Sequence, residues 1–227
     1  PINTGVSTTS FVVIPAPVIT SFTPTNGVAS SVVVLSGANF TGATQVTFNG
    51  IVASVYAVNS NTQITVTVPV GATTGLISVT AIGGTGSSAS TFTIPPVNDL
   101  CVNAQPITCG QTLTGTTIGA TDLGDPTISC ASVTVDAGGV FYSIIGKGAD
   151  ITLSTCGTAT TFDSKLFVYS GTCGNYVCVA GNDDAGGSCG NASAVTFGTL
   201  AGTTYLIFVS GFADAVGPFS LRATCAT

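Results

Sequence analysis

Hydrophobic and polar positions alternate over short stretches of this chain, and Gly, Pro, Ser and Asn separate the stretches about every eight to twelve residues. The stretches are rich in Val, Ile, Thr, Phe and Tyr, which favour strands, and none has the spacing of a long amphipathic helix. Short strands at this spacing are typical of β-sandwiches. The pattern therefore predicts an all-β chain.

The composition changes abruptly at Pro95-Pro96. No Asp, Glu, Lys, Arg or Cys precedes this point, whereas all eight cysteines and all charged residues, three basic and nine acidic, follow it. Because 227 residues suffice for two ordinary domains, we expect two β-sandwiches in tandem. The expected parts are an N-terminal strand over residues 1–15, a first domain over 16–94, a semi-rigid proline linker over 95–98 and a second domain over 99–227.

The segment 4–15 repeats the pattern of segment 85–95, which is expected to close the first domain. Its run Phe11, Val12, Val13 and Ile14 is apolar on both faces, so something should cover it. One hypothesis is that residues 1–14 complete a sheet in a neighbouring copy, which would build a head-to-tail filament. The alternatives are an extra edge strand on its own domain and the closing strand of an upstream repeat.

Turn residues bound each expected strand. Asn49-Gly50 predicts a two-residue hairpin, because both residues tolerate positive φ. The expected strands of the first domain are 18–22, 31–35, 45–48, 52–58, 63–68, 76–81 and 90–94. Those of the second domain are 111–118, 133–135, 140–145, 151–154, 165–169, 177–180, 194–197, 204–209 and 219–223.

Five segments of the first domain occur in the order found in a known family. They are residues 17–27 (PVITSFTPTNG), 36–40 (SGANF), 46–50 (VTFNG), 62–69 (TQITVTVP) and 75–79 (GLISV). On these segments the domain resembles the IPT/TIG family of immunoglobulin-like domains. The resemblance implies an Ig-like sandwich that serves as a spacer or contact module in bacterial surface proteins. Some relatives bind DNA, but a domain without charge contradicts that role.

Six short and different motifs are spread through the second domain. They are residues 98–101 (NDLC), 139–143 (GVFYS), 152–157 (TLSTCG), 162–171 (FDSKLFVYSG), 182–184 (NDD) and 201–207 (AGTTYLI). On these motifs the domain resembles the bacterial pre-peptidase C-terminal (PPC) family. The resemblance implies a jelly-roll-like, non-catalytic sandwich that accompanies secreted proteases and surface proteins, with relatives that bind calcium or matrix polymers.

The eight cysteines favour disulfides over a zinc site, since the chain has no His and no pair spaced as C-x₂-C. Cys173 and Cys178 flank a Gly-Asn turn and are expected to form a hairpin disulfide. Cys101 and Cys225, at the two ends of the domain, are a second candidate pair. The sequence leaves four cysteines unassigned: Cys109, Cys130, Cys156 and Cys189. Because disulfides persist in oxidising compartments, we expect an extracellular or cell-surface protein.

One local cluster could carry site chemistry, namely Asp163 with Asn182, Asp183 and Asp184. Carboxylate and amide oxygens are ligands that calcium accepts in loose geometry, so this cluster is the candidate calcium site. The alternative is that these are Asx-type residues that only shape the loop. No other cofactor is expected.

The amino-acid composition limits the classes of function that the chain can have. A net charge of −6 argues against nucleic acid and anionic membranes as partners, and no apolar run could span a bilayer. Without His or Glu the usual acid-base assignments are missing, so we expect no enzyme. The preferred hypothesis is a non-catalytic extracellular structural protein, a subunit of a surface fibre or adhesin that contacts copies of itself or neighbouring repeat modules. The alternative is a carbohydrate- or matrix-binding accessory module of a larger secreted protein.

Overall fold

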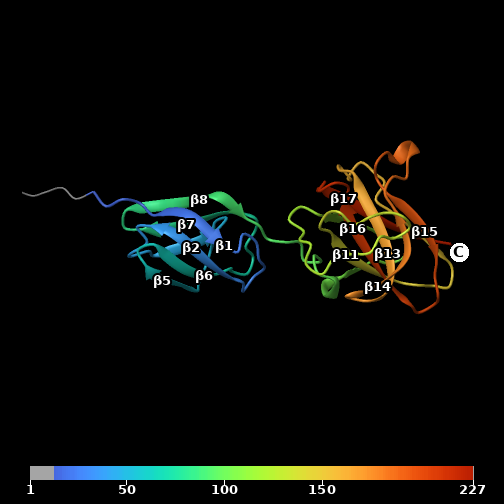
Figure 1. Ribbon diagram of the computed structural model, residues 1–227, viewed down its shortest axis with the longest axis horizontal. Helices are drawn as coiled ribbons and strands as arrows, with labels where there is room; N and C mark the ends of the chain where they lie inside the picture. The colour runs from blue at the N-terminus through green and yellow to red at the C-terminus, as the bar shows by residue number, and fades with distance from the viewer. Residues whose placement is uncertain (1–12, 227) are drawn as a thin grey trace, which may run out of the picture. The chain divides into compact units, whose positions relative to one another are not determined.

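The computed structural model describes residues 13–226, and the chain divides between Ile94 and Pro95 into two compact units (Figure 1). Both units consist of packed β-sheets, which confirms the predicted all-β class with tandem sandwiches. No helix within residues 13–226 has the length and apolar character needed to cross a bilayer. Phe11 and Val12, and with them most of the predicted N-terminal strand, lie outside the described residues. Val13 and Ile14 are exposed.

The first unit is a sandwich of two four-stranded antiparallel sheets. One sheet has the order β1 (Val18–Thr23), β2 (Val32–Ala38), β6 (Gln63–Thr67) and β5 (Tyr56–Ser60). The other has the order β4 (Ile51–Val52), β3 (Gln45–Phe48), β7 (Gly75–Ala81) and β8 (Gly84–Phe92). Alternate residues of both sheets point inward. The Phe92 ring lies between Phe22 and Phe48 in the core, with its centroid 6.1 Å and 5.1 Å from theirs.

Asn49 and Gly50 have φ of 45° and 85° and connect β3 to β4, which confirms the predicted hairpin. The single strand predicted over residues 52–58 is wrong. It splits into β4 and β5, which belong to different sheets. The break occurs at Ala53, which is buried and donates its N–H to Val46 O, while Val55 O accepts from Thr67 on the other sheet. A short apolar run can therefore change sheets without any Gly or Pro to mark the corner.

The second unit packs a four-stranded sheet against a five-stranded one. The first has the order β10 (Thr112–Thr116), β17 (Pro218–Cys225), β12 (Asp150–Ser154) and β15 (Ala194–Gly198). The second has the order β14 (Asn175–Asn182), β13 (Ser164–Thr172), β16 (Thr204–Gly211), β11 (Val140–Ile145) and β9 (Gln105–Pro106). Two 3-10 turns, Cys101–Asn103 and Gly187–Cys189, complete the regular elements. Inward residues such as Leu166, Ile207 and Phe219 form the core between the sheets.

Residues 117–139, here called the cover segment, connect β10 to β11 and pack on the outer face of the five-stranded sheet. Beneath them lies a second cluster that contains Phe141, Phe167, Tyr169 and Phe208, against which Val133 and Val135 pack. The strand predicted over residues 133–135 is wrong, since only one isolated bridge, between Cys130 and Val133, forms there. These valines are buried by side-chain packing and not by strand pairing, so both faces of the sheet are covered.

Four disulfides close the second unit: Cys101–Cys173, Cys109–Cys225, Cys130–Cys178 and Cys156–Cys189. Both predicted pairs are wrong. In the β13–β14 hairpin Cys178 lies opposite Tyr169, whereas Cys173 lies at the turn, so register keeps them apart. Cys225 ends β17, and Gly110 donates its N–H to Ala223 O, which brings Cys109 and not Cys101 beside Cys225. Four disulfides indicate folding in an oxidising compartment.

Candidate functional site

The structure brings together three of the four residues predicted as a calcium site. One carboxylate oxygen from each of Asp163, Asp183 and Asp184 lies within 4.8 Å of the others. Asp163 immediately precedes β13, and the two other carboxylates immediately follow β14, so the pairing of these neighbouring strands places them at one end of the sheet. Asn182, the fourth predicted residue, does not belong to this group of carboxylates. Its amide donates to Asp184 O at 3.2 Å and accepts from Ala194 N at 3.0 Å, which shapes the loop.

Buried hydroxyl groups hold this acidic loop in place. The Ser193 hydroxyl is fully buried and lies 2.5 Å from Ser164 O and 2.9 Å from Asn182 O, and it also contacts Asp183 O. Thr155 Oγ1 accepts from Ser193 N at 2.9 Å and lies 2.7 Å from Ser164 Oγ. Because buried polar groups are costly unless satisfied, this network fixes the loops that carry the carboxylates.

The carboxylates retain capacity for a ligand. Asp163 Oδ1 and Asp183 Oδ1 are buried and have no hydrogen-bond partner. Burial raises the pKa of Asp183, and the carboxylates of Asp163 and Asp184 add to this rise, whereas the charge of Lys165 opposes it. Hard oxygen donors of this kind fit a divalent cation such as Ca²⁺. If a cation is bound, Asp163 and Asp183 would supply the inner oxygens and Asp184 the exposed one.

The only ion pairs within residues 13–226 belong to Lys165, which is 1% exposed. Its Nζ lies 2.8 Å from Asp136 Oδ1 and 3.7 Å from Asp183 Oδ2. It also donates to Thr134 O at 3.3 Å and lies 4.7 Å from the centre of the Phe212 ring. Lys165 therefore connects the cover segment to the acidic loop.

A second group of carboxylates lies along the cover segment. Asp99 accepts from the N–H and the hydroxyl of Thr121 at 2.6 Å and 2.7 Å. Asp125 accepts from Gly139 N at 3.2 Å, but its Oδ1 is buried without a partner, as is the hydroxyl of Tyr169. Burial raises the pKa of Asp125 to about 7, and the nearby charges of Asp99 and Asp122 add to this rise, while the Gly139 N–H opposes it.

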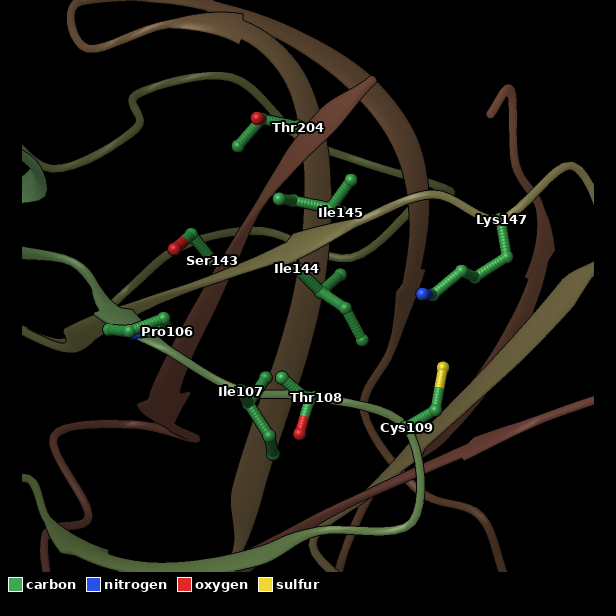
Figure 2. A pocket seen from close by; sticks show the side chains of 9 residues that line it. All are labelled: Pro106, Ile107, Thr108, Cys109, Ser143, Ile144, Ile145, Lys147 and Thr204. Carbon is green, nitrogen blue, oxygen red and sulfur yellow. The ribbon is translucent and has the colours of Figure 1, made fainter. Parts of the chain in front are cut away.

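A hollow at the β9–β11 edge of the second unit has a volume of about 410 Å³. Figure 2 shows its two walls, residues 106–109 on one side and Ser143, Ile144 and Ile145 on the other, with the Lys147 side chain reaching toward Ile144. Ile107 and Ile144 are buried in the floor, and Ile145 is 60% exposed. Thr199 Oγ1 anchors the Lys147 loop by accepting from two backbone N–H groups. Hydroxyls of Thr108, Ser143 and Thr204 complete the lining.

The tyrosines are not free to stack on a ligand. Tyr142, Tyr169 and Tyr205 are buried, and burial raises the pKa of Tyr142 and of Tyr169. Tyr176 donates to Gly124 O at 2.9 Å and its ring stacks on Phe141. These four tyrosines are therefore held by packing or by a hydrogen bond within the unit.

Sequence reasoning missed Lys147, Asp125 and the Lys165–Asp136 pair. No local pattern signals them, because each depends on segments that are distant in the chain. The only available signal was the small number of basic residues. A chain with two lysines and one arginine has few side chains that could form an ion pair or bind a ligand through a positive charge.

Residues 17–94 match the IPT/TIG domain family, so the first unit contains an IPT/TIG domain as predicted. No curated protein matches the chain. Solved structures that are similar include a putative phosphatase from Bacteroides thetaiotaomicron, with 24% identity over 49% of this chain and 22% of that chain and a TM-score of 0.33. They also include an auxiliary nutrient binding protein from Bacteroides ovatus, with 20% identity over 48% and 24% of the two chains and a TM-score of 0.34.

A third similar structure is SGBP-B from a complex xyloglucan utilization locus in Bacteroides uniformis. Its identity is 11% over 93% of this chain and 74% of that chain, with a TM-score of 0.32. The chain spans about a quarter or less of the first two structures. At these TM-scores the similarity carries no inference about function.

Proposed function

We propose that this chain, whose first unit contains an IPT/TIG domain, is a non-catalytic extracellular binding module and that its second unit binds carbohydrate. The observation that carries the proposal is the hollow beside Lys147. Its volume of about 410 Å³ falls within the common range for ligand pockets, roughly 300–1,000 Å³. In this proposal the second unit is a PPC-like accessory domain and the first is its spacer.

The lining suits a sugar. A sugar ring presents hydroxyl groups along its edge and C–H groups on its faces. Three hydroxyl side chains and the Lys147 ammonium supply donors and acceptors, and isoleucine side chains supply an aliphatic floor. The net charge of −6 repels anions at long range, so a neutral sugar is favoured over an acidic one.

A non-catalytic role is consistent with the available side chains. All eight cysteines form disulfides, so no thiol is left as a nucleophile. In addition, the hollow has no carboxylate among its lining residues that could pair with Lys147 as acid and base.

The proposal is tested by calorimetric titration of the full chain with neutral cello- and chito-oligosaccharides, and by pull-down on cellulose, chitin and collagen. Ile145→Asp places a charge at the mouth of the hollow at an exposed position, so it should abolish binding without unfolding the domain. Val177→Asp, at an equally exposed position on β14, is the matched control and should bind as the parent does. Equal binding by both variants, or no binding by the parent, contradicts the proposal.

A second candidate function is a surface fibre subunit. The specific observation is that the first unit has no charged residue, while its exposed side chains include Val18, Val32 and Val52. Surface charge normally keeps molecules apart, so a charge-free domain favours lateral or head-to-tail contact. Negative-stain imaging of the full chain and of a variant without residues 1–14 tests this candidate. Filaments that persist after the deletion would exclude the hypothesis that residues 1–14 complete a sheet in the neighbouring copy.

A further inference from the structure

Lys165 and Asp136 meet in a setting that differs from a surface ion pair. Lys165 shares a face of β13 with Phe167 and Tyr169, the aromatic residues beneath the cover segment, and it is 1% exposed. Asp136 approaches from the cover segment. Its two oxygens lie 2.8 Å and 3.0 Å from Lys165 Nζ, so the carboxyl carbon lies directly beside the nitrogen.

We propose that this pair condenses to an intramolecular amide, an isopeptide bond between Lys165 Nζ and Asp136 Cγ. The ammonium first gives one proton to the carboxylate, which leaves a neutral amine beside a carboxylic acid. The nitrogen then attacks Cγ, the N–C bond forms and the C–OH bond breaks. The departing hydroxyl takes a second proton from the nitrogen and leaves as one water molecule. The step is a dehydration and needs no oxidant or other co-reactant.

The geometry favours the attack of the nitrogen on Cγ, since both Asp136 oxygens lie within hydrogen-bond distance of Lys165 Nζ. A fixed contact replaces an encounter in solution, and well-oriented groups reach effective concentrations on the order of 10⁵ M or more. The Asp136 side chain is 36% exposed, so the released water has a way out.

The bond would fasten the cover segment beside an existing disulfide. Cys130–Cys178 ties this segment to β14, and the amide would tie it to β13, the neighbouring strand. The amide alone would keep the cover segment attached to β13 after the disulfides are reduced. This inference is independent of the carbohydrate proposal, since the hollow beside Lys147 is lined by other residues.

Mass spectrometry of the full chain tests the inference. After reduction, the intact mass should be lower than the sequence mass by one water molecule. Trypsin can cut after Lys147, Lys165 and Arg222. An amide at Lys165 blocks the second cut, so the reduced digest should contain residues 1–147 joined to residues 148–222 as one branched peptide.

Variants assign the bond. Lys165→Arg and Asp136→Ala should both restore the full sequence mass. Lys147→Gln, which changes the other lysine, should retain the loss of water. If the parent chain has its full sequence mass after reduction and trypsin cuts after Lys165 as completely as after Lys147, the pair is an ion pair only and the inference is wrong.

Discussion

The partly buried carboxyl of Asp125 should make the stability of the second unit depend on pH near neutrality. Its pKa rises from an ordinary value of 3.8 to about 7, so the folded state holds a proton that the unfolded state has released. Stability from this group is fully present below about pH 4 and is lost as the pH rises to about 7. Asp125→Asn remains neutral throughout and should remove this part of the pH dependence.

The expected magnitude follows from linkage. A rise from 3.8 to about 7 corresponds at full strength to about 4 kcal/mol. Because the carboxyl is only partly buried, solvent screening reduces this value, and we expect about 1–2 kcal/mol. Asp99 and Asp122 contribute to the rise, so high salt should reduce the difference further.

The assay is urea unfolding of the oxidised chain between pH 4 and pH 8. The first unit is a built-in control, since it has no Asp, Glu, Lys, Arg or His and its unfolding should not change over this range. Asp125→Asn should gain stability relative to the parent as the pH rises. If the parent and the variant lose stability in parallel between pH 4 and pH 7, the burial of Asp125 does not govern this pH dependence.

Three further predictions concern stability. Millimolar calcium should raise the melting temperature of the parent and not of Asp163→Asn or Asp183→Asn, and an unchanged parent would exclude the calcium site. Ser193→Ala should destabilise the second unit by about 1–3 kcal/mol in urea unfolding, because it leaves buried carbonyls unsatisfied; a loss below 0.5 kcal/mol would contradict this role. Gly86→Ala should destabilise the first unit by about 1–3 kcal/mol, since the new Cβ would lie 1.8 Å from Pro17 O; an unchanged unfolding midpoint would contradict it.

The fold could be predicted from the sequence because it depends on local patterns. Alternation, turn residues and the composition break at Pro95 are all visible in single stretches of chain. The errors arose where two distant segments decide the outcome. Residues 52–58 change sheets at Ala53, and residues 133–135 pack by side chains, so neither behaves as one paired strand. The cysteine pairing failed for the same reason, since it depends on which strands are neighbours.

The proximity of Asp163, Asp183 and Asp184 could be predicted because Asp183 and Asp184 are adjacent in sequence and Asp163 precedes the neighbouring strand. The sequence did not show which partners the other charged side chains contact. Asp99 binds Thr121 and Asp136 binds Lys165, so these carboxylates hold the cover segment in place. Lys147, in contrast, makes no ion pair within residues 13–226 and reaches into a hollow at the β9–β11 edge. A cation without a partner beside a hollow is available to a ligand. Under the proposed function, this contrast favours the β9–β11 edge over the aspartate-bearing loops as the place where the second unit would bind a ligand other than a metal ion.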